Sequence, residues 1–109
     1  MKDCIFNLHV PSHDSGLDTC PKLDENLKPV YGGSEIILIP GGSTAVRSAI
    51  EKQQPVLGLH GHIHESRGFV KLGRTLCLNP GSEYTEGMLH GVVVELDEKG
   101  VRNYLLTVG

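Results

Sequence analysis

The stretch of sequence that decides the fold is Val56-Leu-Gly-Leu-His-Gly-His-Ile-His64. Its first part, Val56 to His60, is a short apolar run that follows Pro55, and such runs are typical of buried strands. The run leads directly into a turn at Gly61, and the whole stretch carries three of the six histidines of the chain. Because ligands of open α/β sheets bind at the carboxyl ends of strands, we expect the chemistry of this chain at that turn.

Upstream of this stretch, the sequence predicts a helix and an earlier strand. Ser43 is a suitable N-cap for a helix over residues 44–53, and apolar residues follow at i, i+3 and i+4 spacing (Val46, Ala49 and Ile50). Residues 36–39 form a short strand-like run that Pro40 interrupts. A strand, a helix and a strand in succession imply a crossover connection, so we expect a parallel sheet at this point.

The remaining segments predict strands at both ends of the chain. Residues 4–10 have the length and composition of a strand that Pro11 ends, which leaves His9 at its carboxyl end. Residues 11–33 are rich in turn-forming residues without a sustained period, so we predict a long surface loop. Four short runs at 69–72, 75–78, 91–96 and 101–106 predict antiparallel hairpins, the last pair joined by residues 97–100. No repeat or linker divides the chain, which we treat as one α/β unit over residues 1–109.

The composition is that of an ordinary small globular domain. The chain has 109 residues, of which 39% are hydrophobic and 21% charged. Its net charge of −3 and the absence of any long Lys/Arg run argue against nucleic-acid binding through a basic patch. The apolar runs are far shorter than the roughly 20 residues of a membrane span. The first residues do not resemble a signal peptide, so we expect a cytoplasmic location.

The cysteines do not indicate a disulfide framework or a zinc module. There are three, Cys4, Cys20 and Cys77, which is an odd number without any C-x-x-C spacing. We therefore predict reduced thiols, with Cys4 and Cys77 in the core because both fall in apolar runs.

The histidines are the candidates for metal binding. Neutral imidazole is a common ligand of first-row transition metals, and His62 and His64 lie two residues apart in one turn. His9 ends another strand and could reach the same edge of the sheet. The alternative is that these are surface histidines of a glycine-rich turn. We expect His60 to be packed in the core or behind the metal ligands, and the two other histidines to be solvated (His13 and His90).

These motifs resemble the closing half of the calcineurin-like metallophosphoesterases. The matching run is Gly61-His-Ile-His-Glu65, followed by Gly73-Arg-Thr75 and then by Asn79-Pro-Gly-Ser82. The strand end at His9-Val-Pro11 is similar to the family's isolated metal-binding histidine. The resemblance covers essentially the whole chain, and the G-H-x-H motif becomes specific when it is joined to N-P-G-S. It implies half of an αββα sandwich, with parallel strands around one crossover helix followed by antiparallel hairpins.

The resemblance also implies an activity and a set of site residues. In the family's arrangement His9 and His62 bind one ion of a two-metal site, and His64 binds the other. The ions are divalent metals such as Mn, Fe, Zn or Ni, and a hydroxide that bridges them attacks phosphorus. The chain would thus be a metal-dependent phosphoester hydrolase, of phosphodiesterase or phosphatase type, with a phosphoester substrate. Other residues are expected behind the ligands or on the substrate side (His60, Glu65 and Asn79), and Asn79 to Ser82 is expected to form a structural turn.

The sequence departs from the family in its missing early motifs. It contains no Asp-x-His and no Gly-Asp or Gly-Asn dipeptide, so the bridging aspartate has no counterpart. Three aspartates follow His9 in the long loop, but their positions match a substrate-side loop (Asp14, Asp18 and Asp24). We assign no catalytic acid or base. Because two neighbouring cations need a bridging anion, we expect a missing N-terminal half, or self-association of the unfinished sheet, to complete the site.

Two other functions are consistent with the same residues. One is a non-catalytic protein-interaction module, or a truncated relic, on the phosphoesterase fold. The other is a structural site in which His9, His62 and His64 hold a single zinc ion. The second alternative predicts that metal removal unfolds the chain.

Overall fold

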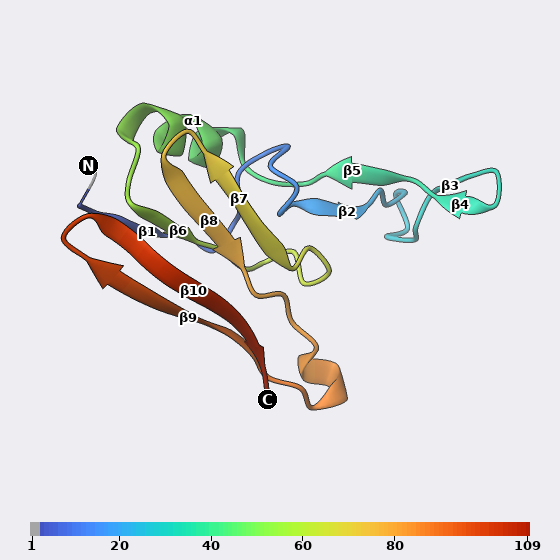
Figure 1. Cartoon of the computed structure of the whole chain (residues 1–109). Coiled ribbons are helices and arrows are strands. Elements are labelled where there is room, and N and C mark those ends of the chain that lie inside the picture. Colours follow the sequence, from blue (N-terminus) through green and yellow to red (C-terminus); the bar gives the residue numbers. More distant parts are fainter. Residues whose placement is uncertain (1–2) are drawn as a thin grey trace.

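The computed structural model describes residues 3–109 and contains a four-stranded mixed sheet at its centre (Figure 1). The strand order is β1 (Ile5–Asn7), β6 (Leu57–Leu59), β8 (Thr75–Asn79) and β7 (Gly68–Leu72). The pairs β1–β6 and β6–β8 are parallel, whereas β7 and β8 form an antiparallel hairpin. The predicted α/β class, with parallel strands and a following hairpin, is therefore confirmed at this level.

The single α-helix of the described residues, α1 (Thr44–Gln53), has the predicted bounds, and one short 3-10 helix, η1 (Tyr84–Glu86), follows β8. The Ser43 hydroxyl accepts the N–H of Val46 at 3.1 Å, which caps the first turn. At the other end Gln54 adopts a left-handed conformation, with φ of 47°. Its side-chain amide donates to the carbonyl of Leu72 at 3.0 Å and its amide oxygen accepts the N–H of Arg74 at 2.6 Å. Gln54 thus ties the end of α1 to the turn between β7 and β8.

Another element packs on each face of the sheet. Helix α1 packs on one face, where Ile50, Leu72 and Cys77 are buried together with Leu17. The hairpin of β9 (His90–Asp97) and β10 (Gly100–Val108) covers part of the other face and packs against a second buried cluster (Leu57, Leu76 and Leu78). Because β8 lies between these two layers, all five of its residues are buried.

A long two-stranded arm, residues 19–40, extends away from the sheet (Figure 1). Its inner half pairs β2 (Thr19–Pro21) with β5 (Leu38–Pro40), and its outer half pairs β3 (Tyr31–Gly32) with β4 (Glu35–Ile36). The prediction that residues 11–33 are a long surface loop is wrong at β2 and β3, which are paired strands. Residues 36–39, which were expected to join the parallel sheet, lie outside it. Ile36 pairs with β3, and Leu38 and Ile39 pair with β2. The crossover that contains α1 therefore joins β1 to β6.

Asp18 anchors the base of the arm. Its carboxylate is 1% exposed and accepts backbone N–H groups of Asp14 at 2.7 Å, Ser15 at 3.2 Å and Gly42 at 2.9 Å. A side chain at Gly42 would begin 2.5 Å from the carbonyl oxygen of Pro11, so only glycine allows this approach. These bonds occupy the Asp18 carboxylate, which makes it a structural residue.

Two further predictions concern exposure. Cys77 is buried as predicted, but Cys4, which precedes the edge strand β1, is exposed. No helix among residues 3–109 is long and apolar enough to cross a membrane.

Candidate metal centre

The carboxyl ends of β1 and β6 bring His9 and His62 together. The two strands are parallel neighbours, and Leu8 donates its N–H to the carbonyl of Leu59 at 3.1 Å. Beyond the strands Gly61 donates its N–H to the carbonyl of His9 at 2.8 Å. The backbone hydrogen bonds thus continue past the ends of both strands. They place Gly61 beside His9, 52 residues away in sequence, and so bring His62 to the same edge of the sheet.

The imidazole rings of His9 and His62 lie in contact. Their centroids are 5.3 Å apart and their planes meet at 76°. Both residues are exposed, so the rings are accessible from solvent. Gly61 lies directly beside the His9 ring, since a side chain there would begin 3.4 Å from Nδ1 of His9. Two neighbouring imidazoles of this kind can direct nitrogen atoms to one ion.

The backbone at His62 adopts a conformation that side chains rarely take. Its φ is 61°, and the N–H of Ile63 donates to the carbonyl of Gly61 at 2.6 Å, which closes a three-residue turn. Such backbone costs about 1–3 kcal/mol and persists where surrounding contacts hold it. Here Ile63 supplies those contacts, because its side chain is buried and its carbonyl is hydrogen bonded.

Asn79, the last residue of β8, joins the motifs that the sequence analysis singled out. Its side chain is fully buried, and its amide donates to the carbonyls of Leu17 and Ile63, both at 3.1 Å. Its amide oxygen accepts the N–H of Gly81 at 2.9 Å. One buried side chain therefore connects the histidine turn to the loop after His9 and to the N-P-G-S turn. A buried amide with three partners satisfies its hydrogen-bonding groups at low cost.

The N-P-G-S turn also contacts the histidine turn through its backbone. Ser82 donates its N–H to the carbonyl of His64 at 3.1 Å. Gly81 has a φ of 75°, and a side chain there would begin 3.0 Å from the same carbonyl oxygen. Glycine is therefore required where the two turns meet.

His64 does not join His9 and His62 in one cluster. It is exposed, and within residues 3–109 no group of three or more His, Cys, Asp or Glu side chains is arranged to hold a metal ion. Two of the three predicted ligands thus come together, and the third lies two residues along the same turn. Glu65 is also exposed, and its carboxylate adds to the effect of burial in raising the pKa of Cys20.

His60 is buried behind the turn, as predicted. Its side chain packs on the α1 side of the sheet, where Nε2 occupies the space that a side chain at Gly58 would need. Nδ1 lies 2.9 Å from the carbonyl oxygen of Leu8. Because a carbonyl only accepts, Nδ1 carries the proton, and Nε2 is a buried nitrogen with no hydrogen-bond partner among residues 3–109. Burial lowers the pKa of His60, so the ring is neutral.

His90 was expected to be solvated, and this prediction is wrong. Its side chain is only 7% exposed. Nδ1 lies 3.0 Å from the carbonyl oxygen of Pro80, and Nε2 lies 2.8 Å from a carboxylate oxygen of Glu83. The ring joins the N-P-G-S turn to the start of β9. No local signal could have indicated this role, because the pairing depends on how the segment of residues 80–90 folds back.

No protein-family model, no curated protein and no solved structure matches this chain.

Proposed function

We propose that this chain carries part of the metal centre of a phosphoester hydrolase of the calcineurin-like metallophosphoesterase type. The observation that supports the proposal is the contact between the rings of His9 and His62 at the carboxyl ends of two parallel strands. That edge is the usual ligand site of open α/β sheets. The link from Asn79 to the histidine turn further supports the view that G-H-x-H and N-P-G-S serve one site.

The layer order is consistent with this family's architecture. Helix α1, the central sheet and the β9–β10 hairpin are three successive layers. We propose that they are part of an αββα sandwich, of which the chain supplies about half. Strand β1 pairs with β6 alone among the described strands, so its other edge is open to a further strand.

The histidines fit a first-row divalent metal such as Mn, Fe, Zn or Ni. His9 and His62 would hold one ion, and His64 would contribute to a second. Such ions polarise a phosphoryl oxygen and lower the pKa of bound water. The chain's own residues position the ligands: the three-residue turn sets the direction of His62, and Asn79 holds that turn through Ile63. Neutral His60 fills the interior behind them.

The donor set of residues 3–109 is incomplete for two ions. No carboxylate among them joins the paired histidines, and two adjacent cations require an anion between them. We therefore propose that a bridging carboxylate comes from another polypeptide segment or from a second copy of the chain.

The test is metal binding together with hydrolysis of bis-p-nitrophenyl phosphate in the presence of manganese. His9→Ala and His62→Ala are expected to weaken metal binding by about tenfold or more, since each removes a direct ligand. Once the bridging carboxylate is supplied, His64→Ala is expected to abolish turnover while the chain still binds one ion. The matched control is His13→Ala, which changes a histidine of the preceding loop and should leave binding unaltered.

The outcomes separate the parts of this proposal. Equal metal affinity in the parent chain, His9→Ala and His62→Ala would exclude the paired histidines as ligands. Metal binding without turnover would support the requirement for a further segment, which is then supplied as a second polypeptide. Unfolding on addition of a chelator would instead favour the structural zinc site.

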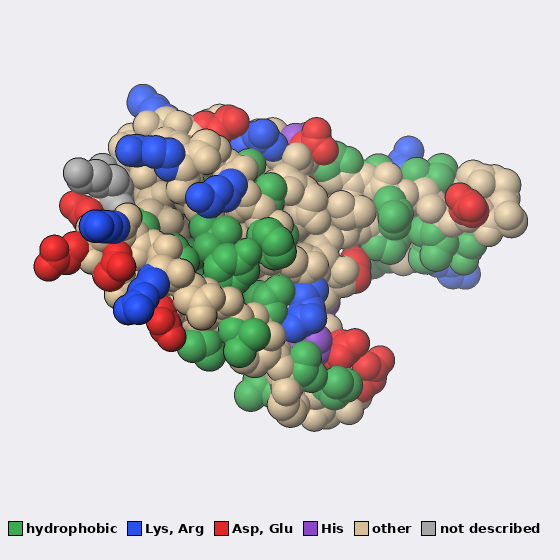
Figure 2. Space-filling model, viewed as in Figure 1, with side chains coloured by type: hydrophobic (Ala, Val, Ile, Leu, Met, Phe, Trp, Pro, Cys, Tyr) green, Lys and Arg blue, Asp and Glu red, His purple; other side chains and the backbone are tan. Residues whose placement is uncertain are grey.

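A second candidate function is a non-catalytic interaction module. The observation that favours it is the number of large apolar side chains that the arm exposes, including Leu27 at 77% and Leu38 at 60% (Figure 2). Large exposed apolar areas mark interaction surfaces. A chain that binds no metal at millimolar manganese but associates through the arm would support this alternative.

A further inference from the structure

A groove between β7 and β10 lies where the hairpin leaves part of the sheet uncovered. Its volume is about 720 Å³, and its apolar lining includes Val56, Leu76 and Val101. Phe69 is 60% exposed at its border, and its ring centroid is 5.4 Å from that of Tyr104. The groove shares no lining residue with the hollow beside His9, so it is a separate site.

The charges around this groove are of one sign. Four of the chain's ten Lys and Arg residues line it, and no Asp or Glu does (Lys71, Arg74, Lys99 and Arg102). Among residues 3–109 none of these four side chains forms an ion pair or a side-chain hydrogen bond. Figure 2 shows the apolar area at the centre of the molecule with blue side chains around it. In a chain of net charge −3, this concentration of unpaired cations is a local exception.

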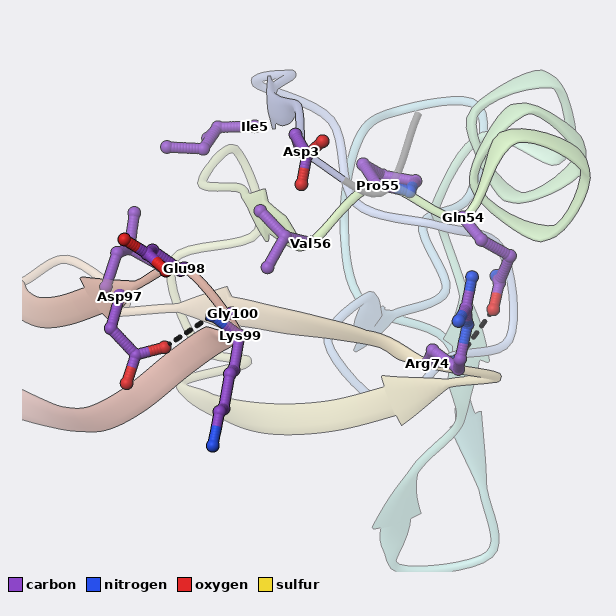
Figure 3. Close-up of a pocket in the computed structure, with 11 residues that line it drawn as sticks. Asp3, Ile5, Gln54, Pro55, Val56, Arg74, Asp97, Glu98, Lys99 and Gly100 are labelled. Carbon is purple, nitrogen blue, oxygen red and sulfur yellow. Dashed lines mark hydrogen bonds between the residues drawn. The ribbon is translucent and has the colours of Figure 1, made fainter.

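An acidic hollow adjoins the groove at the β9–β10 turn (Figure 3). It contains Asp97 and Glu98 and shares two cationic residues with the groove, Arg74 and Lys99. The Asp97 carboxylate accepts the backbone N–H of Lys99 at 2.7 Å. In Figure 3 the Lys99 side chain extends away from Asp3 and Pro55. The Lys99 ammonium group forms no ion pair with any residue among 3–109, so it is available to a ligand.

We propose that the groove binds a small aromatic anion with the size and chemistry of a nucleoside monophosphate. A planar base would stack on the exposed ring of Phe69, and the apolar floor would exclude water from its far side. The phosphate would lie among the cationic side chains, for which charge-assisted hydrogen bonds are the strongest available contacts. The volume falls within the roughly 300–1,000 Å³ of small-molecule sites.

The test is titration with adenosine monophosphate, followed by amide NMR shifts in β7 and β10. Adenosine and inorganic phosphate are titrated separately, because each carries only half of the proposed ligand. The nucleotide is expected to bind at least about fivefold more tightly than either, and more weakly at high salt. Phe69→Ala and Arg102→Glu are each expected to weaken binding by about three- to tenfold.

Matched controls separate a local effect from a general one. Leu105→Ala removes an exposed apolar side chain elsewhere on β10, and Lys22→Glu reverses a charge on the arm. Neither should change nucleotide affinity. No saturable shift up to about 5 mM nucleotide, or equal loss in the controls, overturns the proposal. The proposal is also overturned if the chain associates with itself in a concentration-dependent way and Phe69→Ala and Arg102→Glu abolish that association. The groove would then be occupied by a second copy of the chain.

Discussion

Strand β8 and the arm contain similar amino acids in opposite surroundings. Every residue of β8 is buried, and Leu78 has no exposed surface. In the arm, Leu38 is a strand residue too, but 60% of its surface is exposed. The difference lies in what covers each strand, because β8 has a layer on both faces and the arm is an isolated two-stranded ribbon. Such ribbons are marginal in water, so we expect the stability of the chain to come from the sheet.

The largest predicted effect is that of Leu78→Ala. This change removes a fully buried side chain and leaves a cavity between the sheet and the β9–β10 hairpin. The free energy of unfolding should fall by about 3–5 kcal/mol, measured by urea denaturation. A loss below about 1 kcal/mol would mean that the hairpin does not pack on β8 in solution.

The next effect concerns the end of β8, where Asn79 joins three segments. Asn79→Ala leaves two carbonyls and one N–H without their partner, and should cost about 2–3 kcal/mol. Asn103→Ala on β10 is the control, because that side chain is exposed and, among residues 3–109, accepts a hydrogen bond only from the neighbouring N–H of Tyr104. Equal losses in the two variants would contradict the joining role of Asn79.

The third prediction is a pH dependence of stability that comes from Cys77, a buried residue of β8. Burial raises the pKa of this thiol to about 11 from an ordinary value of 9.0. As pH rises, the Cys77 thiol therefore ionises in the unfolded chain before it ionises in the folded chain. Its contribution to the free energy of unfolding is fully present below pH 9 and falls as pH rises from 9 towards 11. The loss should be on the order of 1–2 kcal/mol, seen as a falling urea midpoint. Cys77→Ala should flatten this slope, whereas Cys4→Ala, which changes an exposed thiol, should retain it.

The smallest effect is expected in the arm. Leu38→Ala is the same chemical change as Leu78→Ala, but it removes a side chain that is already mostly in water. The free energy of unfolding should change by less than about 0.5 kcal/mol in the same urea assay. A loss of about 2 kcal/mol or more would show that the arm is covered in solution, and a dependence on protein concentration would identify the cover as a second copy.

Local signals in the sequence were sufficient for several elements. Helix α1 begins and ends at the predicted residues because Ser43 and Pro55 act on their immediate neighbours. The β7–β8 and β9–β10 hairpins lie close to the predicted runs, since short turns join strands that are adjacent in sequence. The burial of His60 was likewise predictable, because it continues the apolar run of β6.

By itself, then, the sequence determined the α/β class, the helix, the hairpins and the histidines that form the candidate site. Only the tertiary structure decided that residues 38–40 pair within the arm, that Cys4 is exposed and that His90 is held between Pro80 and Glu83. It also brought His9 against His62 and left His64 apart from them. The physical reason is that periodicity and turn residues describe a segment and its nearest neighbours. Pairing between distant strands, and the layer that covers each face, depend on packing of the whole chain.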